Sequence, residues 1–483
     1  MNRMIGFLLW ALFCFQGLSA QEVLYSSYEQ FDIRNGDYSV AGKVGGRLYA
    51  YRNAGGDAYL DAYNDSMVRT ATVILDFFPK KIYETRFVIS GNSIIVLYQA
   101  IEGNKVVQYA ALLDDRGRLQ KGPIQLSEAR TGLFGPTRNY FSSAVSEDKK
   151  TIVVYSAAEK GEQIDFEGKW IDEQLNVTHR NHTVYKGDGN DLGHGDAIVT
   201  NEGTLYLPVY TPIGGKDFSD QLWMLGMPAQ GGKFVAKELP MSNTFIANVY
   251  AKLDNNNKRI YIGGFYSDKK NGNYIGVLYA YYDITTGDFM AKKTLPFDAR
   301  LVNATGERSK KHAFNDFKVK QLIVKNDGGF VLIAENYYMT TRSSYSPGWG
   351  YYSWYAPNMA TNVREYHYND ILALSYNGDG SKQWDAFVRK EQYSQEDGGI
   401  FSSYALLNSG GTLAFLFNDF NTSRSRIQLA TIDGEGNTNM RSFNADREND
   451  PDWLPASGKQ VSAREMIVPC LKRKQICFAK IVF

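Results

Sequence analysis

The sequence contains few of the residues that most often carry out chemistry. Its 483 residues include only 5 histidines and 3 cysteines, and proline, at 13, is also scarce. The sequence has no H-E-x-x-H motif, no glycine-rich phosphate loop and no G-x-S-x-G nucleophile elbow. We therefore predict no catalytic residue, no metal site and no cofactor, and the sequence favours a binding or structural role over catalysis.

An excess of charge of either sign is also missing. Lysine and arginine total 53, and aspartate and glutamate total 52. A nucleic-acid footprint or a polybasic membrane surface needs a clustered positive excess. The balance argues against a nucleic-acid partner.

The apolar run near the N-terminus is typical of an export signal. Arg3 precedes an apolar run of 11 residues, Ile5–Phe15, and Gly17–Ala20 supplies a cleavage site. A membrane span needs about 20 apolar residues. We predict that residues 1–20 form a signal peptide and that the mature chain is exported, to the periplasm or outside the cell, with no transmembrane segment. The alternative is a buried N-terminal strand or helix.

Export leaves Cys470 and Cys477 as the cysteines of the mature chain. If Ile467–Phe483 folds as a hairpin centred between Arg473 and Lys474, the two cysteines lie opposite each other. Opposed residues of antiparallel strands have Cα atoms about 4.5–5.5 Å apart, which suits a disulfide. We predict a structural disulfide, because a metal site has too few ligands nearby and the spacing is wrong for redox catalysis.

Helical periodicity is absent from the mature sequence, and a pattern of two hairpins recurs instead. Short alternating or apolar runs are separated by turns rich in Gly, Asn and Asp, which is the signal of strands and hairpins. Seven units of two hairpins cover residues 40–76, 86–119, 141–185, 196–239, 247–295, 317–388 and 402–443. One further hairpin, residues 462–483, follows as half a unit.

Four strands in every 45–55 residues or so are typical of a propeller blade. The C-terminal half-unit needs two more strands, and Val23–Ile33 can supply them. We predict a single all-β domain over residues 21–483, a β-propeller of eight blades whose ring is closed by N- and C-terminal strands in one blade. Seven blades is the main alternative. A chain of three β-sandwiches is a second, and it would need linkers rich in Pro or Ser, which the sequence lacks.

Three short turn phrases carry a resemblance to known repeats. The phrase SEDKKTIVVY (Ser146–Tyr155) resembles the strand-turn-strand phrase S-x-D-G-K-x-I-x-F of TolB-like propeller repeats, with Lys149 where glycine is usual. Asn377–Trp384 and Asp433–Asn437 resemble the outer hairpins of uncharacterised bacterial envelope propellers. The resemblance implies a propeller in an envelope setting and assigns no catalytic residue.

Polar residues precede several of the predicted innermost strands. In a propeller these strands line the central channel, so the residues before them surround one of its mouths. Convergent polar groups of this kind can form a ligand pocket. The candidates are His194, Asp196, His312 and Asp316. The other interpretation is that these side chains cap strand ends and bind channel water.

The sixth unit contains an insertion, residues 337–368, that is rich in aromatic side chains. Loops longer than about 12–15 residues are usually functional or disordered, and disordered segments are poor in aromatics. Tyrosine and tryptophan are enriched at protein interfaces and also stack on sugar rings. The insertion could pad the ring, face a partner or bind a glycan. Its candidate binding residues are Trp349, Tyr351, Tyr352, Trp354 and Tyr355.

Two functional hypotheses follow. The first is a non-enzymatic binding or scaffold subunit of a bacterial cell-envelope assembly, associated with the outer membrane, whose partner is another envelope protein and whose contact surface is the aromatic insertion. The alternative is a carbohydrate-binding protein or glycan-active enzyme that uses the polar residues at the channel mouth.

Overall fold

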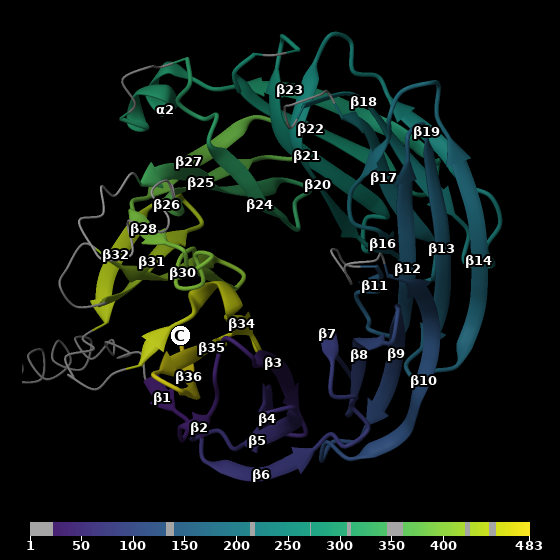
Figure 1. Cartoon of the computed structure of the whole chain (residues 1–483). Coiled ribbons are helices and arrows are strands. Elements are labelled where there is room, and N and C mark those ends of the chain that lie inside the picture. Colours follow the sequence, from purple (N-terminus) through teal and green to yellow (C-terminus); the bar gives the residue numbers. More distant parts are fainter. Residues whose placement is uncertain are drawn as a thin grey trace, which may run out of the picture.

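A computed structural model describes residues 23–131, 140–212, 218–270, 272–306, 311–344, 361–420, 426–443 and 451–483. These residues form a β-propeller, a ring of radially arranged antiparallel sheets around a central channel (Figure 1). One α-helix occurs in the described part of the chain, α2 (Ala299–Ala304), and the Asp298 side chain caps its first turn by accepting from Leu301 N–H. The prediction of an all-β propeller is confirmed.

The first four blades each begin with the innermost strand. Blade 1 consists of β3 (Asp37–Val44), β4 (Arg47–Ala54), β5 (Asp57–Tyr63) and β6 (Arg69–Ile74). Blade 2 consists of β7 (Ile82–Ser90), β8 (Ser93–Glu102), β9 (Lys105–Leu113) and β10 (Leu119–Arg130). Blade 3 consists of β11 (Ser142–Val145), β12 (Thr151–Lys160), β13 (Gln163–Asp172) and β14 (Val177–Lys186). Blade 4 has an interrupted inner strand and consists of β15 (Gly193–His194), β16 (Ile198–Val199), β17 (Leu205–Pro212), β18 (Phe218–Met227) and β19 (Val235–Leu239).

The next three blades repeat this order. Blade 5 consists of β20 (Phe245–Asp254), β21 (Arg259–Ser267), β22 (Gly276–Asp283) and β23 (Asp288–Pro296). Blade 6 consists of β24 (Phe317–Val324), β25 (Phe330–Ser344), β26 (Thr361–Tyr376) and β27 (Lys382–Val388), with β28 (Gln392–Gln395) beside β26. Blade 7 consists of β29 (Ala405–Asn408), β30 (Thr412–Asp419), β31 (Arg426–Asp433) and β32 (Thr438–Phe443).

The eighth blade closes the ring with both ends of the described chain. Its strands are β33 (Asp452–Trp453), β34 (Lys459–Gln460), β35 (Glu465–Lys472), β36 (Gln475–Val482), β1 (Val23–Tyr25) and β2 (Glu29–Gln30), and a 3₁₀ turn, Pro455–Ser457, separates β33 from β34. Val23 pairs with Ile481, as ring closure requires. Both β1 and β2 lie on the outer edge beside β36, so β33 and β34 supply the inner edge that the sequence left unassigned.

Each interface between neighbouring blades has its own hydrophobic core. The side chains of a strand point alternately to its two faces, so Ile94 and Val96 of β8 pack toward blade 1, whereas Ile95 and Leu97 pack toward blade 3. The central strands are buried on both faces, which explains their continuous apolar runs. Within the described residues, eight such clusters follow one another around the ring, including one between blades 8 and 1.

The C-terminal hairpin has the predicted register, with Cys470 opposite Cys477 and the turn at Arg473 and Lys474. Both cysteines are buried, and the structure has them as free thiols, so the predicted disulfide is not formed here. Burial raises the pKa of the Cys470 thiol, and a hydrogen bond with Cys477 raises it further. The Cys470 thiol therefore keeps its proton in this structure.

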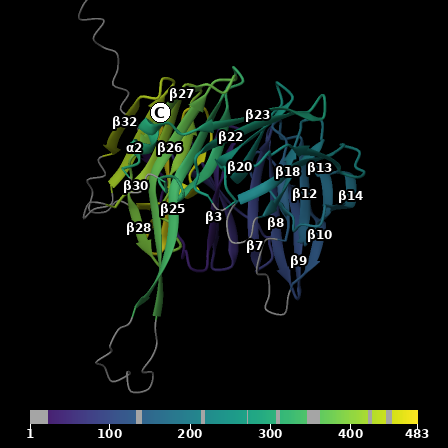
Figure 2. The ribbon, with the colours of Figure 1, turned by 90° about the horizontal axis from the view of Figure 1, so that it is seen from above.

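One hairpin stands out from the ring. The pairing of the inner strand β24 with β25 ends at Asn336. Strands β25 and β26 stay paired with each other from Tyr337 and Tyr368 onward, and together they project from one face of the ring (Figure 2). This projection is the stem of the predicted insertion. The predicted signal peptide, residues 1–20, and the five aromatic candidates Trp349, Tyr351, Tyr352, Trp354 and Tyr355 lie outside the described residues.

Candidate anion-binding channel

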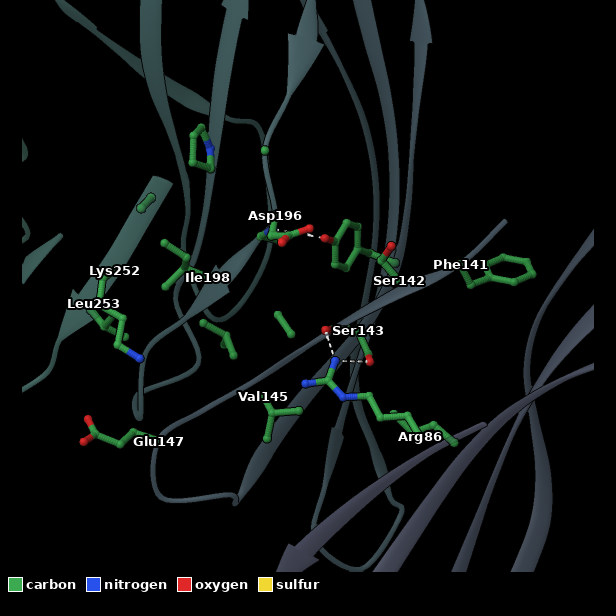
Figure 3. A pocket seen from close by; sticks show the side chains of 18 of the residues that line it. Arg86, Phe141, Ser142, Ser143, Val145, Glu147, Asp196, Ile198, Lys252 and Leu253 are labelled. Atoms are coloured by element: carbon green, nitrogen blue, oxygen red, sulfur yellow. Dashed lines mark hydrogen bonds between the residues drawn. The ribbon is translucent and has the colours of Figure 1, made fainter. Parts of the chain in front are cut away.

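Inner strands of blades 2 to 5 enclose a cavity of about 580 Å³ on one side of the channel. Side chains from four blades converge there, including Arg86, Ser143, Glu147, Asp196 and Lys252 (Figure 3). A second cavity, of about 630 Å³, lies between blades 1, 2, 3 and 8. Arg86, Val145 and Lys149 line both cavities, so the two adjoin.

Arg86 extends from β7 into the space between blades 2 and 3. Its Nη1 donates to the backbone oxygen of Ser143 at 2.6 Å and to the Ser143 Oγ at 2.7 Å. The residue is exposed to solvent, yet the channel walls surround the guanidinium, and this burial lowers the pKa of Arg86. An arginine nevertheless keeps its proton, so a fixed positive charge lies at the junction of the two cavities.

Lys149 occupies an unusual backbone position in the turn between β11 and β12. Its φ is 63°, in the left-handed region that favours glycine. Burial lowers the pKa of Lys149, and the positive charges of Arg86 and Lys252 lower it further. Lys149 thus combines a left-handed backbone with two like charges nearby, while the charges of Glu147 and Asp148 raise its pKa in part. Such strain is often found at functional sites.

Two more lysines complete the cluster. Lys252 lies on β20 in the wall of the first cavity, and Lys459 lies on β34 in the wall of the second. Burial lowers the pKa of Lys459, with further contributions from Arg86 and Lys149, while its Nζ donates to Val40 and Ala41 carbonyls. We call Arg86, Lys149, Lys252 and Lys459 the channel cluster. Within the described part of the chain, none of its members forms an ion pair.

The acidic residues of the first cavity bind neutral partners instead of the channel cluster. Glu84 accepts from Gln99 at 2.6 Å, and Glu147 accepts from Asn255 at 2.7 Å. Burial raises the pKa of Glu84, although the nearby Arg86 opposes this shift. The remaining carboxylate of the cavity belongs to Asp196, whose charge also acts on Arg86.

Two tyrosines face the cavity near Asp196. The hydroxyl of Tyr155 accepts from the backbone N–H of Ala197 at 3.0 Å, which leaves its own proton available to donate. Burial raises the pKa of Tyr155 and that of Tyr250, and the charge of Asp196 adds to both shifts. Both hydroxyls therefore remain protonated donors. The cavity thus combines cations, aromatic faces and neutral hydrogen-bonding groups.

The structure separates the four residues predicted at the channel mouth. Asp196 lines the first cavity. His194 lies just outside it, with its ring nitrogens 2.8 Å from Gly195 O and 3.0 Å from Ala157 O. His312 and Asp316 belong to the segment that leads into blade 6, where Asn315 Nδ2 lies 3.2 Å from His312 Nδ1 and Asp316 O accepts from Tyr337 N–H. They line none of the three described cavities.

The sequence analysis did not predict the channel cluster, because each of its four members belongs to a different blade. One signal was present in the phrase that resembles TolB-like repeats. Lysine at position 149 replaces the usual glycine, and a bulky residue at a left-handed position is unfavourable. Other non-glycine residues of the described chain, among them Leu175 and Lys258, share this conformation, so the exchange alone does not identify a site.

Two negative findings apply to the part of the chain that the structure covers. No group of three or more His, Cys, Asp or Glu side chains could hold a metal ion. No helix there has both the length and the apolar character needed to cross a membrane.

Comparisons with known proteins find similarity of structure alone. No protein-family model matches the sequence, and no curated protein matches it. Among solved structures, prolyl oligopeptidase B from Galerina marginata has 12% identity and a TM-score of 0.41, over 90% of this chain and 56% of that one. This chain thus spans little more than half of the oligopeptidase. The polysaccharide lyase Uly1 has 12% identity and a TM-score of 0.40, over 82% of this chain and 89% of that one. A PL25-Ulvanlyase bound to -[GlcA(1-4)Rha3S]- has 10% identity and a TM-score of 0.40, over 81% of this chain and 90% of that one.

Proposed function

We propose that the protein binds an anionic carbohydrate in its channel. The observation that carries this proposal is the channel cluster. Arg86, Lys149, Lys252 and Lys459 share two adjoining cavities and form no ion pair within the described residues, although Glu84, Glu147 and Asp196 also line the first cavity. Cations that are surrounded by protein and repel one another raise the energy of the empty channel. A carboxylated or sulfated ligand gives these cations a direct partner and forms strong charge-assisted hydrogen bonds.

The other groups of the channel favour a sugar over a simple anion. Gln99, Gln108, Ser142 and Asn255 offer neutral amides and a hydroxyl that suit the hydroxyl groups of a sugar ring. Tyr98, Phe141, Tyr155 and Tyr250 line the same cavity and offer apolar ring faces. The balanced charge of the whole chain argues against a nucleic acid as the anion.

Binding to a panel of oligosaccharides tests this proposal. We expect uronic-acid or sulfated oligosaccharides to bind and neutral oligosaccharides of equal length to bind at least about tenfold more weakly. Arg86→Gln and Lys149→Gln should each weaken binding about tenfold, and added salt should weaken it further. Calorimetry measures all three effects.

Lys233→Gln is the matched control, because Lys233 is exposed outside the described cavities. Equal losses in the control and in Lys149→Gln would refute the channel as the site. Chromatography of the bound oligosaccharide shows whether it is cleaved. Cleavage that stops in Asp196→Ala while binding persists would extend the proposal to a glycan-active enzyme.

A second candidate is the scaffold subunit of a bacterial envelope assembly that the sequence suggests, which requires the proposed export signal. The projecting stem of β25 and β26 favours it, because these paired strands extend from one face of the ring (Figure 2). Met339 on this stem is 51% exposed, and the ring of Tyr338 stacks on His367 with centroids 4.4 Å apart. We infer that the stem presents the insertion to another envelope protein.

Deletion of residues 349–359 tests this candidate. We expect a specific envelope protein to co-purify with the full chain and to be lost with the deletion, while anionic oligosaccharides still bind in the channel. Unchanged co-purification would contradict the scaffold function without affecting the channel proposal.

A further inference from the structure

A third cavity, of about 280 Å³, lies at the base of the projecting stem. Its walls come from three successive blades, 6, 7 and 8. The lining residues are Tyr393, Ser394, Asp397, Phe401, Asn418, Phe420, Asp452 and Trp453. This set contains two aspartates and no lysine or arginine. Its charge is therefore opposite to that of the channel cluster.

The polar atoms of this cavity are mostly acceptors. Asp452 has no hydrogen bond or ion pair from its carboxylate within the described residues, and burial raises the pKa of this side chain. Asp397 accepts at Oδ1 from Ser394 Oγ (2.7 Å) and Gly399 N–H (2.8 Å), and the described residues place no donor on its Oδ2.

Asn418 adds a third unused acceptor. The residue is 3% exposed, and its Nδ2 donates to the backbone oxygens of Phe401 at 2.7 Å and Trp453 at 2.9 Å. These two bonds fix the orientation of the amide. Its Oδ1 is buried and has no hydrogen-bond partner. A buried acceptor without a donor costs about 1–3 kcal/mol, so a bound donor would stabilise this wall.

Aromatic rings form the rest of the cavity. Trp453 is 2% exposed and packs edge-on against Tyr25, with centroids 6.0 Å apart, so its position is fixed. Tyr393 is 44% exposed and donates its hydroxyl proton to Glu365 Oε1 at 2.8 Å, which holds the ring at the rim. Ring faces attract cations, most strongly where water is excluded.

We propose that this cavity binds an organic cation, an alkylammonium or guanidinium group, between its aromatic rings and the carboxylates of Asp397 and Asp452. Such a group has several N–H donors and no acceptor, which complements the carboxylates of Asp397 and Asp452. Among the described residues, Asn418 Oδ1 and the indole N–H of Trp453 are the buried polar atoms of the wall without a hydrogen-bond partner. The volume of about 280 Å³ is large enough for a group of this kind. The cation comes either from a free small molecule or from an arginine or lysine of another polypeptide.

Calorimetry with matched probes tests this site. Acetyl-arginine methylamide is the cationic probe, and acetyl-citrulline methylamide has the same shape without the charge. We expect the arginine probe to bind at least about tenfold more tightly. Asp452→Asn should weaken binding of the arginine probe about tenfold, and Tyr393→Ala should weaken it by a smaller factor. Asp188→Asn, the same change at an exposed aspartate outside this cavity, should have no effect.

One further probe, methylguanidinium, identifies the source of the cation. Methylguanidinium that binds as tightly as the arginine probe indicates a small-molecule ligand, whereas a tighter arginine probe indicates a polypeptide side chain. Equal binding of the arginine and citrulline probes, no detectable binding of either, or an unaffected Asp452→Asn protein would each overturn the proposal. Folding of the variants is checked by their binding of anionic oligosaccharides in the channel, or by near-ultraviolet circular dichroism if none binds.

Discussion

Charged side chains gather both at the seam between blades 8 and 1 and in the channel, but their partners differ. At the seam, Lys480 Nζ lies 2.6 Å from Glu465 Oε1, and Lys43 Nζ lies 2.8 Å from Asp65 Oδ1. Close by, Glu29 of β2 pairs with Arg69 at 2.5 Å. Every one of these charges has an opposite neighbour. In the channel cluster the four cations form no ion pair within the described residues, and the nearby carboxylates of Glu84, Asp196 and Glu147 act on Arg86 and Lys149 only at longer range.

This difference separates the two roles that charge plays in the ring. Ion pairs between Lys43 and Glu465 (3.2 Å) and between Lys480 and Asp65 (3.5 Å) join blade 1 to blade 8 across the seam. The channel cluster contributes nothing of this kind, since its members weaken one another. Charged side chains that form ion pairs within the fold stabilise it. Charged side chains that line a cavity and form no ion pair are available to bind a ligand.

The largest effect is expected where a buried pair anchors the seam. Asp61 is fully buried, lies 2.7 Å from Arg52 Nε and accepts from Thr72 Oγ1 at 2.6 Å. Asp61→Ala leaves Arg52 buried without its main partner, so we expect the free energy of unfolding to fall by about 3–5 kcal/mol. Urea unfolding measures this loss.

The double variant Arg52→Met, Asp61→Leu is the control for that loss. It removes both charges and leaves neither unpaired, so it should lose clearly less stability than Asp61→Ala. An equal loss in both proteins would show that the charges do not interact as a pair.

The second prediction concerns pH, whose increase should raise stability in both regions but over different ranges, acidic for the seam and alkaline for the channel. Lys43 lowers the pKa of Asp65 by a hydrogen bond, and Lys480 and Lys43 lower that of Glu465. Carboxylates with a lowered folded pKa add stability above their unfolded values, and that stability is lost as pH falls through the folded values. The pKa of Lys149 and Lys459 is also lowered. For a lysine this means that stability increases as pH rises from the folded pKa toward the ordinary lysine value.

Thermal unfolding followed between pH 3 and pH 10 measures both effects. We expect the acid loss to shrink in Glu465→Gln and the alkaline gain to shrink in Lys149→Gln. An alkaline gain of the same size in Lys149→Gln would count against repulsion within the channel cluster.

The smallest effect is expected from neutralising the channel. Lys149→Gln should raise the free energy of unfolding by a few tenths of a kcal/mol, because solvent screens the repulsion. Lys149→Gly also relieves the left-handed backbone and should be about 1 kcal/mol more stable than Lys149→Gln. Both substitutions should lower the affinity for anionic oligosaccharides. A loss of stability in Lys149→Gly would refute the assignment of strain to this position.

The ring could be predicted from the sequence because local patterns repeat in it. Alternating apolar residues and turns rich in Gly, Asn and Asp place the strands, and the pairing of Val23 with Ile481 follows from the incomplete last unit. The inner edge of blade 8 could not be found. Its strands β33 and β34 have two residues each and lack a period.

The site was less predictable because it depends on convergence. Asp196 was found, since its place before an inner strand puts it at the channel. His312 and Asp316 satisfy the same rule but belong to a connection that lies outside the three described cavities. Arg86 and Lys252 lie within strands, where one charged residue among many gives no sign that it faces the channel. Only the radial arrangement of the blades brings them together.

The order in which the strands of blade 8 are made has a consequence for synthesis. The ribosome produces β1 and β2 early, but their partner β36 comes after every other strand described here. Until then the hydrophobic core between blades 8 and 1 has only one of its two sides. The apolar side chains of blade 1 that face this core therefore remain uncovered, and prone to aggregation, while the other blades form. The ring can close only after its last hairpin, β35 and β36, has been made.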